Sequence, residues 1–171
     1  MNMQRPIVKV NFYSMHMNDI DQISLKNFIL NASRATYASG NDTIKQKQAD
    51  GSTTIECKEG SYSYHDNYFG GEPYGGREVV FLNGKPIWMM VYYGFVHPEA
   101  QSKEIYPFLI DALSHATPEM PYRGPSLFEK ESLSYQNMFI GDLPNFSGTE
   151  KILKNGIIIY EATYLGGLVD R

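Results

Sequence analysis

The chain of 171 residues contains one cysteine, Cys57, and four histidines. A single cysteine excludes an intramolecular disulfide and favours a reducing, cytoplasmic location. The histidines have no metal-ligand spacing, so the sequence predicts neither a bound metal nor a cofactor. Cys57 has no histidine near it in sequence and lies in a strand-like pattern. We therefore interpret it as a small core residue and not as a nucleophile.

Long apolar runs and clusters of positive charge are also missing. No segment approaches the ~20 apolar residues of a membrane-spanning helix, so no membrane association is expected. The net charge is -4 and the lysines and arginines are scattered. This disfavours direct nucleic-acid binding, in which phosphate neutralisation dominates affinity. The N-terminal segment MNMQRPIVKVNFYSMHMNDID lacks a signal-peptide cleavage site and is predicted to form a short strand.

The glycine-rich segment GGEPYGG, residues 70–76, lacks the motifs of a nucleotide site. It does not lead from a strand into a helix with G-x-G-x-x-G spacing, and the Lys-Ser/Thr element of a phosphate-binding loop is absent. No G-x-S-x-G nucleophile elbow occurs. His65 stands beside Asp66, but adjacent strand residues point to opposite faces and cannot form a dyad.

Two segments of the chain are similar to each other, which predicts an internal duplication, with a chance similarity as the alternative. Residues 68–94 align with residues 139–166 when one residue is inserted after Pro144. We interpret the shared glycines as backbone hinges between strands. The aligned pairs include Gly70 with Gly141, Gly76 with Gly148, Glu78 with Glu150, Asn83-Gly84 with Asn155-Gly156, Tyr92 with Tyr164 and, just upstream of these segments, Tyr64 with Tyr135.

Each repeat follows a helix-like pattern, and together these patterns predict an α+β fold. Apolar residues at i, i+3, i+4 and i+7 in 25–35 and 105–116 predict two helices lying on a sheet. The Asn-Gly pairs predict type I′ hairpins, and the polar segments 36–51 and 117–125 predict loops. We expect two pseudo-symmetric helix-plus-antiparallel-meander units, about 18–98 and 99–171, forming one domain over 1–171. The predicted strands lie near 52–57, 61–69, 77–82 and 86–94, and near 126–129, 132–140, 149–154 and 157–166.

Strand alternation predicts an acidic site with aromatic walls. Glu78 and Glu150 each share a strand face with apolar neighbours, and aromatic residues line the equivalent faces. If these faces meet across the pseudo-twofold axis, they enclose a cleft for a small aromatic or cationic ligand. The candidate ligand-binding residues are Tyr64, Glu78, Trp88, Tyr92, Tyr135, Glu150, Tyr160 and Tyr164.

Other interpretations of these residues remain open. The aromatics could pack within the sheet without binding anything, and the glutamates could form surface salt bridges. Arg123, in PYRGP, is either an anion anchor or a residue that pins its loop by hydrogen bonds. The leading hypothesis is a non-enzymatic binding or sensor domain. The alternatives are a hydrolase that uses Glu78 or Glu150 as general base, and a structural or protein-interaction module.

The chain resembles an uncharacterised bacterial domain family of unknown function. The resemblance extends over nearly the whole chain, from FILNASRATYASG through YSYHDNYFGGEPYGGREVVFLNGKPIWMMVYYG and PYRGP to YLGG. In some relatives the domain follows a helix-turn-helix in transcription regulators, which implies a sensor role. The segment before Leu25 is too short for a helix-turn-helix, so a regulatory role implies a separate DNA-binding protein. The two-unit architecture is more loosely similar to gyrase-inhibitor-like effector domains, an analogy of fold alone.

Overall fold

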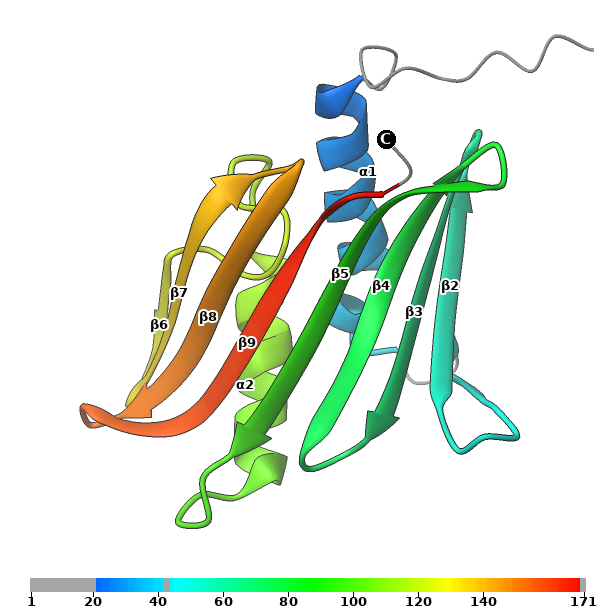
Figure 1. The fold of residues 1–171 in the computed structure, drawn as a ribbon. Helices are drawn as coiled ribbons and strands as arrows, with labels where there is room; N and C mark the ends of the chain where they lie inside the picture. Colours follow the sequence, from blue (N-terminus) through cyan, green and yellow to red (C-terminus); the bar gives the residue numbers. More distant parts are fainter. Residues whose placement is uncertain (1–20, 42–43, 170–171) are drawn as a thin grey trace, which may run out of the picture.

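The computed structural model describes residues 21–41 and 44–169, in which two α-helices lie on one face of a nine-stranded antiparallel sheet (Figure 1). The fold is α+β, as predicted. The predicted N-terminal strand lies outside the described residues. The elements are α1 (Gln22–Ala35), a 3₁₀ turn η2 (Tyr37–Ser39), β1 (Gln46–Lys47), β2 (Thr53–Glu59), β3 (Tyr62–Gly70), β4 (Tyr74–Leu82), β5 (Lys85–Val96), α2 (Ser102–Ser114), β6 (Leu127–Lys130), β7 (Leu133–Asp142), β8 (Asn145–Lys154) and β9 (Ile157–Leu168).

The sheet joins two meanders through their last strands. The strand order is β1-β2-β3-β4-β5-β9-β8-β7-β6, and β5 pairs with β9 in the centre with Tyr92 opposite Tyr164. The two predicted aromatic faces therefore lie side by side on one continuous sheet. The prediction that the two aromatic faces enclose a cleft between them is therefore wrong. Main-chain hydrogen bonds between β5 and β9 place the two meanders next to each other in one sheet, so their faces do not oppose each other.

The helices form where the apolar spacing predicts them. α1 begins after Asp21, whose carboxylate caps the helix by accepting from the Ile23 backbone N–H at 3.0 Å. Neither described helix combines the length and hydrophobicity needed to cross a membrane. In both helices the predicted stripe is buried against the sheet: Leu25, Phe28, Ile29 and Ala32 in α1, and Ile105, Phe108, Leu109 and Ala112 in α2.

The predicted strands are present, with shifts at the glycine-rich connections. β4 and β8 begin at Tyr74 and Asn145, earlier than predicted, because the hairpins that precede them are tight. The predicted loop 36–51 also contains the turn η2 and the short strand β1.

The shared glycines serve two different purposes. Gly70 and Gly141 have positive φ, +79° and +92°, at the ends of β3 and β7, so the hinge interpretation is confirmed for them. It is wrong for Gly76 and Gly148, which pair with Tyr92 and Tyr164 within the sheet. A Cβ at Gly148 would lie 2.4 Å from the Tyr164 ring, and one at Gly76 would lie 2.7 Å from the Tyr92 hydroxyl. These glycines leave room for the tyrosine rings to lie across the strands.

The Asn-Gly hairpins have the positive φ angles of type I′ turns, +78° at Gly84 and +81° at Gly156. Valine at either position should lower the free energy of unfolding by roughly 1 kcal/mol or more, measured by urea denaturation. A Cβ would meet no atom within 4 Å at these sites, so the cost is conformational. Gly71 is the matched control, because it is equally open and has no positive φ. Equal urea midpoints for Gly71→Val and the turn variants would contradict the expectation.

Candidate ligand-binding site

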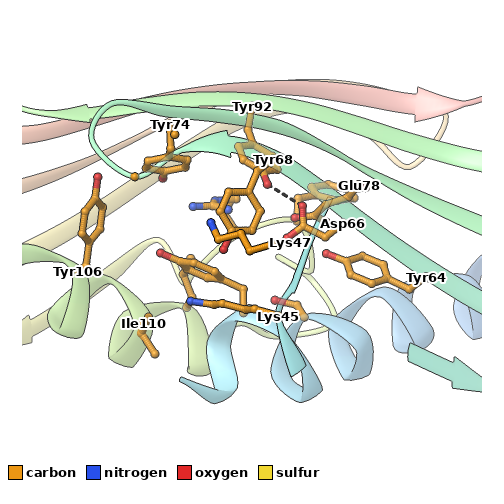
Figure 2. Close-up of a pocket in the computed structure, with 17 residues that line it drawn as sticks. Lys45, Lys47, Tyr64, Asp66, Tyr68, Tyr74, Glu78, Tyr92, Tyr106 and Ile110 are labelled. Carbon is orange, nitrogen blue, oxygen red and sulfur yellow. Dashed lines mark hydrogen bonds between the residues drawn. The ribbon is translucent and has the colours of Figure 1, made fainter. Parts of the chain in front are cut away.

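A cavity of ≈ 330 Å³ lies between the first meander and the two helices. This volume is at the lower end of the range for small-molecule sites, about 300–1,000 Å³. Its walls come from β3, β4 and β5, from the helical segments, from β1 and from the loop before β6 (Figure 2). Seven of the 17 lining residues are tyrosines: Tyr37, Tyr64, Tyr68, Tyr74, Tyr92, Tyr106 and Tyr122.

Two carboxylates face this cavity from neighbouring strands. Asp66 on β3 and Glu78 on β4 are cross-strand partners, and both side chains lie on the helix-covered face. They are only 2% and 7% exposed. The Tyr92 hydroxyl donates to the Asp66 carboxylate at 2.6 Å, which is the dashed contact in Figure 2. Neither carboxylate takes part in an ion pair among the residues that the structure describes.

Burial makes both carboxyl groups weaker acids. Burial first and the nearby charge of Asp66 second raise the pKa of Glu78 to about 8, against the opposing effects of Arg123 and a hydrogen bond from Tyr64. Burial likewise raises the pKa of Asp66 to about 6, against the hydrogen bond from Tyr92 and the charges of Arg123 and Lys45. The pair therefore holds about one proton near neutral pH and would favour a ligand that brings positive charge.

Glu150, which aligns with Glu78, has a different environment. It is 0% exposed and forms a two-point ion pair with Arg123, at 2.6 Å to one guanidinium nitrogen and 3.1 Å to another. Tyr135 and Tyr160 donate to it at 2.6 and 2.8 Å. Burial would raise the pKa of Glu150, but the charge of Arg123 and these hydrogen bonds outweigh it, so the pKa lies below its usual value.

Arg123 contacts residues of both meanders, Glu150 in the second and Tyr92 in the first. The sequence left it as an anion anchor or a loop-pinning residue, and the structure makes it the counter-ion of Glu150. Its guanidinium carbon also lies 5.7 Å from the centroid of the Tyr92 ring, at the cavity wall.

The second meander has no counterpart of the carboxylate pair. Its Asn137 stands where the first meander has Asp66, and Tyr164 donates to that amide oxygen at 2.7 Å as Tyr92 donates to Asp66. Arg123 thus neutralises Glu150, whereas Asp66 and Glu78 beside the cavity have no ion-pair partner in residues 21–41 and 44–169.

The structure divides the eight predicted site residues into two groups. Tyr64, Glu78 and Tyr92 line the cavity. The other five are not among its lining residues and are buried in the core, where Trp88 stacks on Phe146 with ring centroids 5.8 Å apart. These five are Trp88, Tyr135, Glu150, Tyr160 and Tyr164.

Several lining residues were not predicted. Asp66 is not among the predicted site residues, although strand alternation places it on the same face as Tyr64 and Tyr68. Lys45 and Lys47 come from a segment that was predicted to be a loop. Within the described ranges no cluster of three or more His, Cys, Asp or Glu side chains could hold a metal ion.

A family model for a domain of unknown function (DUF5680) matches residues 66–169, which is more than half of the chain. The chain belongs to this family. Searches of curated proteins and of solved structures found no match. The DUF5680 match includes Asp66, Glu78, Tyr92, Arg123 and Glu150. It leaves out α1 and β1, so part of the cavity wall lies outside the matched DUF5680 region.

Proposed function

We propose that this protein is a non-enzymatic binding or sensor domain whose cavity takes a small cationic ligand with an aromatic or apolar body. The observation that carries the proposal is the buried pair Asp66 and Glu78, which faces the cavity without an ion-pair partner among the described residues. A cation placed there would allow both carboxyl groups to ionise. The tyrosine walls would contribute stacking and cation–π attraction.

Supporting this proposal is the contrast with Glu150. A buried carboxylate whose only task is structural is expected to carry its own counter-ion and donors, and Glu150 has both. Asp66 and Glu78 are buried to a similar degree but have no ion-pair partner within the part of the chain that the structure describes. Such an incomplete site is a cost to stability that a bound cation would offset.

We also propose that the two meanders are copies related by a pseudo-twofold axis between β5 and β9. Supporting observations are the pairing of Tyr92 with Tyr164 and the matching hydrogen bonds of these tyrosines to Asp66 and Asn137. Under this proposal the site residues of the second copy became buried core residues, and those of the first copy still line a cavity.

Proton transfer by Glu78 is the second candidate function. A pKa of about 8 is close to the working range of a general acid or base. Glu150 is a poor general base by comparison, because Arg123 and two tyrosine hydroxyls occupy its oxygens. Binding remains the preferred proposal because, among the described residues, the group hydrogen-bonded to Glu78 is the Tyr64 hydroxyl and not a serine, threonine or cysteine.

The proposal predicts binding of benzyltrimethylammonium, a permanent aromatic cation, at pH 8. Binding to the folded state should raise the melting temperature, and benzyl alcohol, the neutral analogue, should have a much smaller effect. Asp66→Asn/Glu78→Gln should weaken calorimetric affinity for the cation by about tenfold or more, because it removes both buried charges.

Two exposed glutamates outside the cavity provide the matched control for this variant. Glu56→Gln/Glu129→Gln removes the same number of charges at positions that do not line the cavity. It should bind the cation as the wild type does. Equal losses of affinity in both double variants would show that the cation responds only to net charge, and the proposed site would be wrong.

A further inference from the structure

The cavity contains positive charge as well as negative charge. Lys45 and Lys47 line it from the segment that includes β1, and Arg123 lines it from the loop before β6. In Figure 2 the ammonium ends of Lys45 and Lys47 are directed to the side where Tyr74 and Tyr106 lie. Asp66 and Glu78 lie on the side of Tyr64. In this view the ammonium groups of the two lysines and the two carboxylates are therefore directed toward opposite ends of the cavity.

We infer that the ligand is zwitterionic, with a protonated amine at Asp66 and Glu78 and an anionic group, carboxylate or phosphate, at Lys45 and Lys47. This inference rests on the proposed function and narrows its ligand class. A ligand with positive charge alone would be attracted at the Asp66 end and repelled by the lysines at the other. A second, anionic group converts this repulsion into attraction, which is how paired charges give specificity.

The tyrosines between the two ends of the cavity would contact the part of the ligand between its two charged groups. Tyr68 lies centrally in the cavity in Figure 2, with Tyr92 and Tyr74 on the sheet side. Their rings would cover an apolar or aromatic spacer, and their hydroxyl groups would remain donors. Lys47 is held in place by its ammonium group, which donates to the Thr53 hydroxyl at 2.8 Å. The fold therefore holds the Lys47 ammonium group at this end of the cavity without a ligand.

Three probes with one ring skeleton test the inference by titration calorimetry at pH 7. These are benzylamine with an amine only, 4-methylbenzoate with a carboxylate only, and 4-(aminomethyl)benzoate with both groups. We expect the affinity for 4-(aminomethyl)benzoate to be at least about tenfold higher than that for benzylamine, which is the gain that one charge-assisted contact would give. We expect 4-methylbenzoate to bind most weakly, since its single charge matches only the lysine end.

Variants separate the two ends of the cavity. In Lys45→Gln/Lys47→Gln the advantage of 4-(aminomethyl)benzoate over benzylamine should disappear, while benzylamine binds at least as well as before. In Asp66→Asn/Glu78→Gln both amines should lose affinity. Equal affinity of the two amines for the wild type would overturn the zwitterion inference and leave the proposed cation site standing. Failure of both amines to bind the wild type would instead overturn the proposed function, and the inference with it.

Discussion

Replacing Arg123 by methionine is expected to lower the free energy of unfolding by about 3–5 kcal/mol, the usual effect of breaking a buried ion pair. Arg123 and Glu150 are 8% and 0% exposed, so water cannot replace the lost guanidinium. Glu150 would keep its donors Tyr135 and Tyr160 but would hold an uncompensated charge in the core. Its pKa should then rise above the usual value, because burial would no longer be outweighed. Guanidinium denaturation at pH 7 measures the loss.

An exposed pair of similar length is the matched control for Arg123→Met. Lys130 contacts Asp111 at 2.8 Å, but the Lys130 side chain is 59% exposed. Lys130→Met should therefore cost at most about 1 kcal/mol. Arg123→Met/Glu150→Gln should be more stable than Arg123→Met, because no unpaired charge remains. If Arg123→Met and Lys130→Met had equal effects, the ion pair would not be a main support of the core.

Much of the fold could be predicted from local patterns. The stripes in α1 and α2 depend on spacing within one segment, and the turns at Gly84 and Gly156 depend on two adjacent residues. The arrangement of the meanders depends on which of their edge strands pair with each other. Several pairings are compatible with the same local sequence patterns, and the residues that decide between them are far apart in the sequence. Residue alternation places Tyr92 and Tyr164 on a face, but it does not show that β5 and β9 continue one sheet.

The candidate site was predictable only in part for a related reason. Glu78 could be predicted as a site residue because the second segment has a glutamate, Glu150, at the aligned position. Asp66 aligns with Asn137, so no repeated carboxylate marked it, and its proximity to Glu78 depends on the β3–β4 register. Tyr37 and Tyr106 reach the cavity from helical segments that pack on the sheet. Their contribution is set by how the helices lie, which residue spacing within each helix does not determine.

Stability of the protein without ligand is expected to fall as the pH rises from 6 to 8. Asp66 and Glu78 have pKa values of about 6 and 8 in the folded protein, against 3.8 and 4.5 as ordinary values. The folded state therefore holds more protons than the unfolded state in this window. This contribution to stability is complete below the ordinary pKa values and is lost as the pH rises through the folded ones. At roughly 1.4 kcal/mol per pH unit for each such proton, and with about one such proton on average between pH 6 and pH 8, the loss is about 3 kcal/mol.

The double variant Asp66→Asn/Glu78→Gln isolates this effect, because its side chains cannot titrate. Urea midpoints at pH 6, 7 and 8 should decrease in the wild type and change much less in the variant. Other groups contribute equally to both proteins, so the difference between the two slopes belongs to the cavity pair and to the charges that face it, Arg123 and Lys45. A bound cation should flatten the wild-type profile as well, since it favours the ionised pair that high pH produces. Parallel profiles for the two proteins would show that the pair keeps ordinary pKa values, and the argument for a cation site would lose its electrostatic basis.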